Sequence, residues 1–263
     1  MNYPFWDPGV SYGLLMGLIA IVHVFISHFA VGGGLYLVIT EHRARARGDS
    51  SVLTYLRRLS RFFILVTLVS GALTGVGIWF IIGLLNPGAT EVLIRTFVWG
   101  WAIEWTFFIT EIAAALLYYY GWDRMDARGH LIVGWIYFLA AWLSLVIING
   151  IITFMLTPGA WLQTGNFWDG FFNPTYWPSL VFRSGVALVM AGLFALWTAS
   201  RGTDLPPNSR LRLLRHNAAW ALAGLAVAAA AAVPYVRAIP AEVLQAAAAG
   251  MTIPTTAQAI LLY

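Results

Sequence analysis

The stretch LIVGWIYFLAAWLSLVIINGIITFML, from Leu131 to Leu156, decides the fold class because it has no charged side chain. A helix needs about 20 mostly apolar residues to cross a bilayer, so this stretch predicts a transmembrane helix. Five further segments have the same character. They are Tyr12–Ile39, Phe62–Leu85, Phe97–Tyr120, Leu180–Ala199 and Ala218–Val236. We therefore expect an all-α membrane protein, a bundle of about six transmembrane helices.

The composition supports a membrane protein and excludes several other classes. The 263 residues are 60% hydrophobic and 10% charged, with a mean hydropathy of +0.77. Soluble domains are about 45–50% apolar and about 25% charged, so a soluble enzyme and a nucleic-acid module are excluded. The chain has no Cys. Disulfides, Cys-ligated zinc, iron–sulfur clusters and covalent c-type haem attachment are therefore excluded for this chain.

Arginine placement predicts the orientation. Arginines concentrate in three alternate connections, at residues 42–61, 121–129 and 201–215, whereas the opposite connections hold little beyond Arg95 and Arg237. Short basic loops stay in the cytoplasm, so the N-terminus is expected on the periplasmic side of a bacterial inner membrane. Met1–Val10 has no basic residue and no small-residue cleavage site, so the first span is expected to be retained.

The outer connections differ in character from the arginine-rich ones. Residues 86–95 and 157–178 are rich in Gly, Pro, Trp and Asn and are predicted as ordered loops. Six aromatic residues gather at the outer helix ends: Trp99, Trp101, Trp161, Trp168, Tyr176 and Trp177. They are interpreted as an interfacial aromatic belt, or as the wall of a cofactor site or docking surface.

The last residues are treated apart from the bundle. Residues 1–237 are expected to form the transmembrane bundle and residues 238–263 an outer tail with a short helix at Ala241–Met251. The final apolar run, residues 259–263, is expected to pack against a partner or to continue into further polypeptide.

Two histidines lie within the first span. Ionisable groups inside a bilayer are costly, so each is a functional hypothesis. His23 and His28 are five residues apart, about 140° around a helix, and do not serve one ligand from one face. Either a structural hydrogen bond or haem-iron ligation explains His23. A structural hydrogen bond is the favoured interpretation of His28.

Glu104 and Glu111 lie on one stripe of the third span, because seven residues make nearly two helical turns. Their depth overlaps that of His23. A buried carboxylate without a partner favours its protonated form. Proton uptake coupled to a redox metal is the functional hypothesis for the pair, and hydrogen bonding to backbone or His is the structural alternative.

The remaining polar residues have simpler interpretations. Arg183, near the outer end of the fifth span, is expected to extend to the interface, to pair with Glu91 or Asp169, or to bind a haem propionate. His130 opens the fourth span and is interpreted as a solvated or helix-capping residue. His42 and His216 lie in basic loops, and no specific role is predicted for them.

Several short motifs occur in a familiar order. His23 is followed by Gly32 and Glu41, then by Leu73-Thr74-Gly75 and by Ile103-Glu104 with Glu111. Further along the chain are Gly121-Trp122-Asp123-Arg124, His130, Asn149-Gly150, Thr157-Pro158 and residues 172–177, FNPTYW. In this order the motifs resemble subunit I of cytochrome bd-type quinol oxidases over its first four to five spans.

The resemblance implies a function for these residues. It makes His23 an axial ligand of a haem near the outer face, and Glu104 and Glu111 its acidic neighbours on a proton route. We expect at least one haem b in the outer half of spans one to four. Arg183 or Arg95 would neutralise a propionate. A quinone is a second candidate cofactor.

The sequence also departs from that family. The fifth span has no His; Phe182, followed by Arg183, stands where the family places a low-spin haem ligand. The long quinol-binding loop after span six is not recognisable, the later helices are absent, and Glu104 and Glu111 are one residue closer than expected. The chain therefore does not correspond to a complete oxidase subunit.

Three functions are compatible with this pattern. The leading one is a haem-b-binding subunit of a respiratory complex, passing electrons between the quinone pool and an outer-side cytochrome or oxidase partner. It would be a subunit of an oxidoreductase rather than a complete enzyme. The alternative is a non-redox anchor that docks a periplasmic or multihaem catalytic subunit. A transporter is ranked last because neither broken helices nor inverted repeats are evident.

Overall fold

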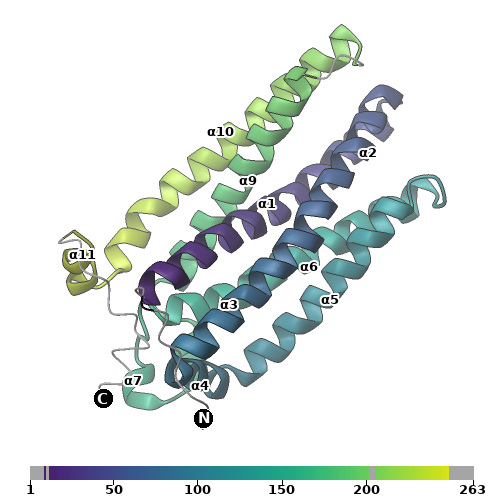
Figure 1. The fold of residues 1–263 in the computed structure, drawn as a ribbon. Coiled ribbons are helices and arrows are strands. Elements are labelled where there is room, and N and C mark those ends of the chain that lie inside the picture. Colours follow the sequence, from purple (N-terminus) through teal and green to yellow (C-terminus); the bar gives the residue numbers. More distant parts are fainter. Residues whose placement is uncertain (1–8, 10–11, 202–204, 249–263) are drawn as a thin grey trace.

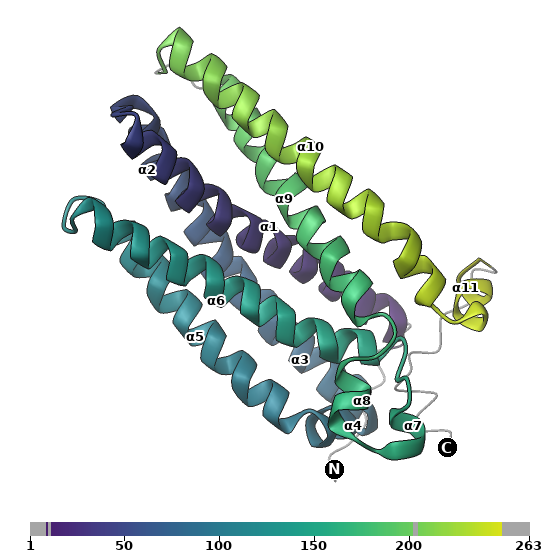
Figure 2. The ribbon, with the colours of Figure 1, turned by 180° about the vertical axis from the view of Figure 1, so that it is seen from behind.

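The chain folds into one elongated bundle of helices, shown from opposite sides in Figures 1 and 2. This computed structural model describes residue 9, residues 12–201 and residues 205–248, and no strand occurs among them. The predicted features at residues 1–8 and 259–263 lie outside the described residues.

Within the described residues, six long helices are apolar enough to cross a membrane, which confirms the predicted fold class. They are α1 (Tyr12–Ala46), α2 to α3 (Ser50–Leu85), α5 (Val98–Tyr120), α6 (Ala127–Phe154), α9 (Tyr176–Arg201) and α10 (Pro207–Ala238). The chain is thus a multi-pass membrane protein.

The helices extend past the predicted apolar spans at one end of the bundle. This end, termed the arginine-rich end, holds the connections α1–α2, α5–α6 and α9–α10 (Figure 1). Helix α1 continues from Ile39 to Ala46, because arginine and glutamate are good helix formers. The chain then turns at Gly48, whose φ is 64°, and Asp49 caps α2 by accepting a hydrogen bond from the backbone N–H of Val52.

The second span is interrupted by a π-helical segment. Helix α2 (Ser50–Leu65) passes into η1 (Val66–Gly71) and then α3 (Ala72–Leu85). Such π-helical turns inside α-helices are rare and occur frequently at functional sites. Hydropathy did not predict η1, because a π-helical segment changes the backbone geometry of a span without changing its apolar character.

The opposite end, termed the aromatic end, is built from short helices. They are α4 (Pro87–Thr96), α7 (Trp161–Thr164), α8 (Phe167–Phe171) and α11 (Ala241–Ala248) (Figure 2). The prediction of loops at residues 86–95 and 157–178 was therefore wrong in conformation, although the segments are ordered. Asn86 and Asn166 cap α4 and α8, accepting hydrogen bonds from backbone N–H groups. The predicted tail helix at Ala241–Met251 is observed as α11; residues past 248 lie outside the described part.

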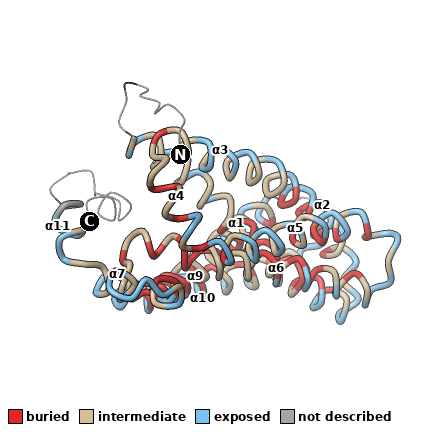
Figure 3. Tube along the Cα trace, turned by 90° about the horizontal axis from the view of Figure 1, so that it is seen from below, coloured by how far each residue is buried: buried red, intermediate tan, exposed pale blue. Residues whose placement is uncertain are grey.

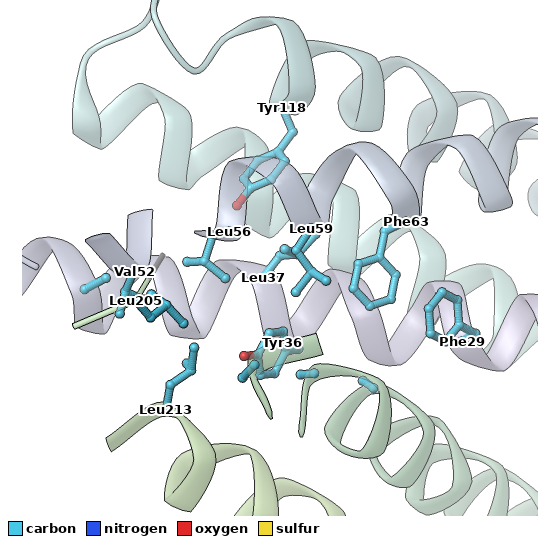
Figure 4. Close-up of a cluster of buried hydrophobic side chains, with 14 residues drawn as sticks. Phe29, Tyr36, Leu37, Val52, Leu56, Leu59, Phe63, Tyr118, Leu205 and Leu213 are labelled. Atoms are coloured by element: carbon cyan, nitrogen blue, oxygen red, sulfur yellow. The ribbon is translucent and has the colours of Figure 1, made fainter. Parts of the chain in front are cut away.

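The apolar core is concentrated on the inner helices. Figure 3 shows buried positions along α1, α6 and α9, whereas α3 is mostly intermediate or exposed. Figure 4 shows the cluster near the arginine-rich end, where Phe29 stacks on Phe63 with ring centroids 4.4 Å apart. Tyr36 lies in the same cluster and donates a hydrogen bond of 2.7 Å to Asn217 Oδ1, which joins α1 to α10.

Helices α9 and α10 approach each other closely through glycines. A Cβ atom at Gly185, Gly192 or Gly224 would lie 2.6 Å from a backbone nitrogen of the facing helix. No side chain larger than hydrogen fits there without separating the helices, and small residues are the usual means of close packing in membranes.

Candidate functional site

His23 is held by the first turn of α3, directly after the π-helical segment η1. Its Nδ1 lies 2.9 Å from Thr74 Oγ1 on α3. Thr74 Oγ1 itself donates to the carbonyl oxygen of Ser70 at 2.7 Å, so its lone pair accepts a hydrogen bond from His23 Nδ1–H. In this tautomer the lone pair of Nε2 is available to a metal, and a hydrogen bond at the other nitrogen is the usual way that a ligating His is oriented.

Gly75 makes room for this imidazole. A Cβ atom at Gly75 would lie 3.2 Å from His23 Cε1, tighter than most contacts of a real Cβ. The absence of a side chain at Gly75 thus lets His23 lie against α3.

His28 has the structural role predicted for it. Its ring is buried, and Nδ1 donates to the carbonyl oxygen of Val24, one turn earlier in α1, at 2.6 Å. This bond ties the ring to its own helix. The two histidines of α1 therefore differ: His23 bonds to another helix and His28 bonds to its own.

The two glutamates of α5 face the interior of the bundle. Glu104 accepts a hydrogen bond of 3.0 Å from Ser144 Oγ on α6, and Glu111 is only 8% exposed. Neither forms an ion pair with an arginine in the described part of the chain. Carboxyl groups in such surroundings are costly to keep and are functional candidates in a membrane protein.

The two candidate arginines lie toward the aromatic end. Arg95 is 78% exposed and forms an ion pair of 2.6 Å with Glu91 on the same helix. Arg183 on α9 is half-buried, and its Nε donates to Ser179 Oγ at 3.1 Å. The alternative pairing of Arg183 with Glu91 or Asp169 is not observed among the described residues; Asp169 accepts from Thr164 Oγ1.

These candidates are not joined by direct contacts. Within residues 12–201 and 205–248, no hydrogen bond or ion pair connects His23 with Glu104, Glu111, Arg95 or Arg183. Helices α3 and α5 meet through Trp79 and Trp101, whose ring centroids are 4.7 Å apart.

Sequence reasoning missed a buried polar network near the arginine-rich end. Glu41 on α1 accepts hydrogen bonds from Tyr118 Oη at 2.7 Å, His130 Nδ1 at 2.7 Å and Arg45 Nε at 2.6 Å. His130 Nε2 lies 2.8 Å from the carbonyl oxygen of Tyr118. Both neighbours of the His130 ring nitrogens are acceptors, the carboxylate of Glu41 and the carbonyl oxygen of Tyr118.

The interpretation of His130 as a solvated or capping residue was therefore wrong. Its side chain is 0% exposed, and Asp126 caps α6 instead, accepting from the N–H of Gly129. The sequence did contain a signal for this network: a carboxylate, Glu41, at the end of one apolar span and a histidine, His130, at the start of another. Hydropathy alone does not show that the two helices place them side by side.

His216 also has specific partners, contrary to the sequence interpretation. Arg43 Nη1 donates to its Nδ1 at 2.9 Å, so its Nε2–H donates to Thr40 Oγ1 at 3.1 Å. This contact joins α1 to α10 at the arginine-rich end.

The fold and these polar groups define a class: a polytopic helical membrane protein with histidine and glutamate side chains within its spanning helices. The model of the family "Cytochrome bd terminal oxidase subunit I" matches residues 14–245. The chain belongs to that family, which confirms the resemblance seen in the sequence. The family is named for a subunit of a cytochrome-type terminal oxidase.

A solved structure supports the fold independently. The bd oxidase from Geobacillus thermodenitrificans matches with a TM-score of 0.73 at 20% sequence identity. The match covers 86% of this chain and 55% of that chain, so the chain spans about half the length of the structure it matches. No curated protein matches the sequence.

Proposed function

We propose that this chain is a haem-b-binding subunit of a respiratory electron-transfer complex, in which His23 Nε2 would hold the haem iron. The observation that carries this proposal is the bond from His23 Nδ1–H to Thr74 Oγ1, which orients the ring and leaves the Nε2 lone pair for a metal. The residues present thus fit a haem. Imidazole is the commonest protein ligand of haem iron.

A bound haem would supply one-electron transfer, and the chain's own residues would set its surroundings. Apolar side chains of α1, α3 and α5 would cover its faces. Arg183 would bind a propionate from its half-buried position. Arg95 would do so only on leaving Glu91, because the two are paired.

Glu111 and Glu104 would hold the compensating proton. Added negative charge nearby favours the protonated form of a carboxyl group, and the effect is large in a medium of low dielectric constant. Ser144 orients Glu104 by its hydrogen bond. Electron and proton uptake would therefore be linked at Glu111 and, to a smaller extent, at Glu104.

The partners follow from this role. Electrons would pass between the quinone pool and an outer-side cytochrome or oxidase subunit in a bacterial inner membrane, with the arginine-rich end in the cytoplasm. A quinone is the second cofactor in this proposal. Membership in a haem-binding family favours this function over a non-redox anchor.

The test is the haem content of the purified complex, measured by reduced-minus-oxidised spectra and haem extraction. His23→Gly is expected to lose the haem signal and to recover part of it when imidazole is added. The matched control is His28→Gln, in the same span, because His28 bonds only to its own helix. A His23→Gly protein with full haem and an unchanged spectrum would overturn the assignment.

A further inference from the structure

A cavity opens at the arginine-rich end between α1, the start of α2 and the first turns of α10. Its volume is about 400 Å³. It is lined by Thr40, Arg43, Ala44, Arg47, Asp49, Val52, Ser209, Arg212, Leu213, Arg215, His216 and Ala219. None of these residues belongs to the candidate haem site.

The lining carries an excess of positive charge. Four arginines face one carboxylate, Asp49, which already accepts hydrogen bonds from Arg212 and Ser209 at 2.6 and 3.0 Å. Arg43, Arg47 and Arg215 form no ion pair with a carboxylate in the described part of the chain. Arg43 instead donates a hydrogen bond to His216 Nδ1. A ring nitrogen that accepts a hydrogen bond carries no negative charge, so it does not balance the charge of Arg43.

Two arginines at this end that lie outside the cavity are neutralised by carboxylates. Arg45 pairs with Glu41, and Arg57 pairs with Asp123. Arg43, Arg47 and Arg215 are exposed at the cavity, and their charge is not balanced by a carboxylate in the described part of the chain. Arginine clusters that converge on a concave site are suited to phosphate groups, which accept several charge-assisted hydrogen bonds at once.

The cavity also has an apolar part and lies at the depth of lipid headgroups. Ala44, Val52, Leu213 and Ala219 contribute apolar lining beside the arginines. The apolar segment of α1 ends near Ile39 and that of α10 begins near Ala218, so the cavity lies where the hydrocarbon region meets the polar surface. Basic pockets between helices at this level are typical binding sites for anionic headgroups.

We propose that this cavity binds a phosphate group at the membrane surface, through Arg43, Arg47 and Arg215. An anionic phospholipid headgroup and a soluble phosphate carry the same chemistry. In either case the bound phosphate would link α1 to α10 by bridging arginines from both helices.

The experiment uses the full chain in its purified complex, stripped of lipid in neutral detergent. Native mass spectrometry would measure retention of added phosphatidylglycerol against phosphatidylcholine, and isothermal titration would measure binding of inorganic phosphate. The test variant is the triple substitution Arg43→Gln, Arg47→Gln and Arg215→Gln. The control triple is Arg61→Gln, Arg124→Gln and Arg128→Gln, which removes equal charge from the same end outside the cavity.

The wild type and the control triple are expected to prefer phosphatidylglycerol, and the cavity triple to lose this preference by roughly tenfold or more. Phosphate binding without a lipid preference, lost in the same variant, would support the site with a soluble ligand. Two results would overturn the proposal: no binding of either probe by the wild type, or equal losses in both triples. Arg47→Gln alone serves as the test variant if the cavity triple does not fold.

Discussion

The two halves of helix α1 differ in what surrounds them. Every buried residue of α1 lies between His28 and Ala44, whereas none of the described residues from Tyr12 to Ser27 is buried. The first half has exposed apolar side chains such as Leu18, Ile21 and Phe25. Helix α3, which packs beside this half, is similarly exposed at Leu73 and other positions.

We term the second half of α1 and the helices around it the complete half, because the chain itself covers these side chains. The first half of α1, together with α3, is the incomplete half, because much of its apolar surface is uncovered. At the arginine-rich end the buried carboxylate of Glu41 finds its hydrogen-bond partners, Tyr118 and His130, within the chain. Toward the aromatic end, α1 and α3 hold His23 and leave large apolar surfaces uncovered. Such surfaces call for lipid, cofactor or another subunit to cover them.

The largest expected effect concerns the complete half. Glu41→Ala would leave Tyr118 Oη, His130 Nδ1 and Arg45 Nε without their shared acceptor. Breaking a buried ion pair by removing one partner costs about 3–5 kcal/mol, so a loss of stability of this size is expected. Equilibrium unfolding in mixed micelles would measure it.

The control for that substitution is Glu91→Ala at the aromatic end. Glu91 pairs with the exposed Arg95, and exposed pairs contribute about 0–1 kcal/mol. Equal losses of stability from Glu41→Ala and Glu91→Ala would contradict the proposed difference between the two halves.

Amide hydrogen exchange, measured with and without haem, is the next test of the difference between the two halves of α1. If a cofactor covers the incomplete half, haem removal should speed amide exchange by roughly ten- to hundredfold in residues 12–27 and in α3. The second half of α1 should change much less, because its neighbours come from this chain. Uniform protection along α1 in both states would contradict this.

Glu111→Gln tests the proton coupling proposed for the incomplete half. The haem midpoint potential of the wild type is expected to fall with rising pH by up to about 59 mV per pH unit, the value for one proton per electron. The Gln variant should keep the haem but show a flatter dependence, because its amide does not take up the proton. Spectroelectrochemical titration from pH 6 to 9 would measure both, and Glu91→Gln should retain the wild-type slope.

The smallest expected effect concerns Asp49, outside the spans. Burial raises the pKa of its carboxyl, but hydrogen bonds from Ser51, Arg212, Ser209 and the backbone of Val52 outweigh burial and lower the pKa to about 2. A lowered pKa means that ionised Asp49 stabilises the fold fully above about pH 4, its ordinary range, and that this contribution disappears toward pH 2.

Asp49→Asn should therefore cost about 1 kcal/mol at pH 7, after allowance for solvent screening. Thermal unfolding in detergent at several pH values would measure the difference in stability between wild type and variant. This difference should become smaller from pH 4 to pH 2. A difference that does not change over this range would contradict the assignment. Asp123→Asn is the control, because its pair with Arg57 is exposed.

The spans were predictable and the polar contacts were not, for a physical reason. Hydropathy is a local property, so all six spans could be found from the sequence, and two glutamates seven residues apart share a stripe on any helix. The partner of His23 is 51 positions away in the chain, and that of His130 is 89 positions away. Such pairs depend on how helices are rotated against each other, which composition does not encode.

The close glycine contacts of α9 and α10 have a consequence for biogenesis. These glycine contacts are made to the backbone of the facing helix and involve none of the residues proposed to hold a cofactor, although Arg183 lies close to Gly185 in the sequence. Helices α9 and α10 are consecutive in the chain, so they can pair as a hairpin soon after insertion. We expect maturation to occur on a scaffold that is already half assembled, with the prosthetic group entering from the side of α1 and α3 after the hairpin has docked.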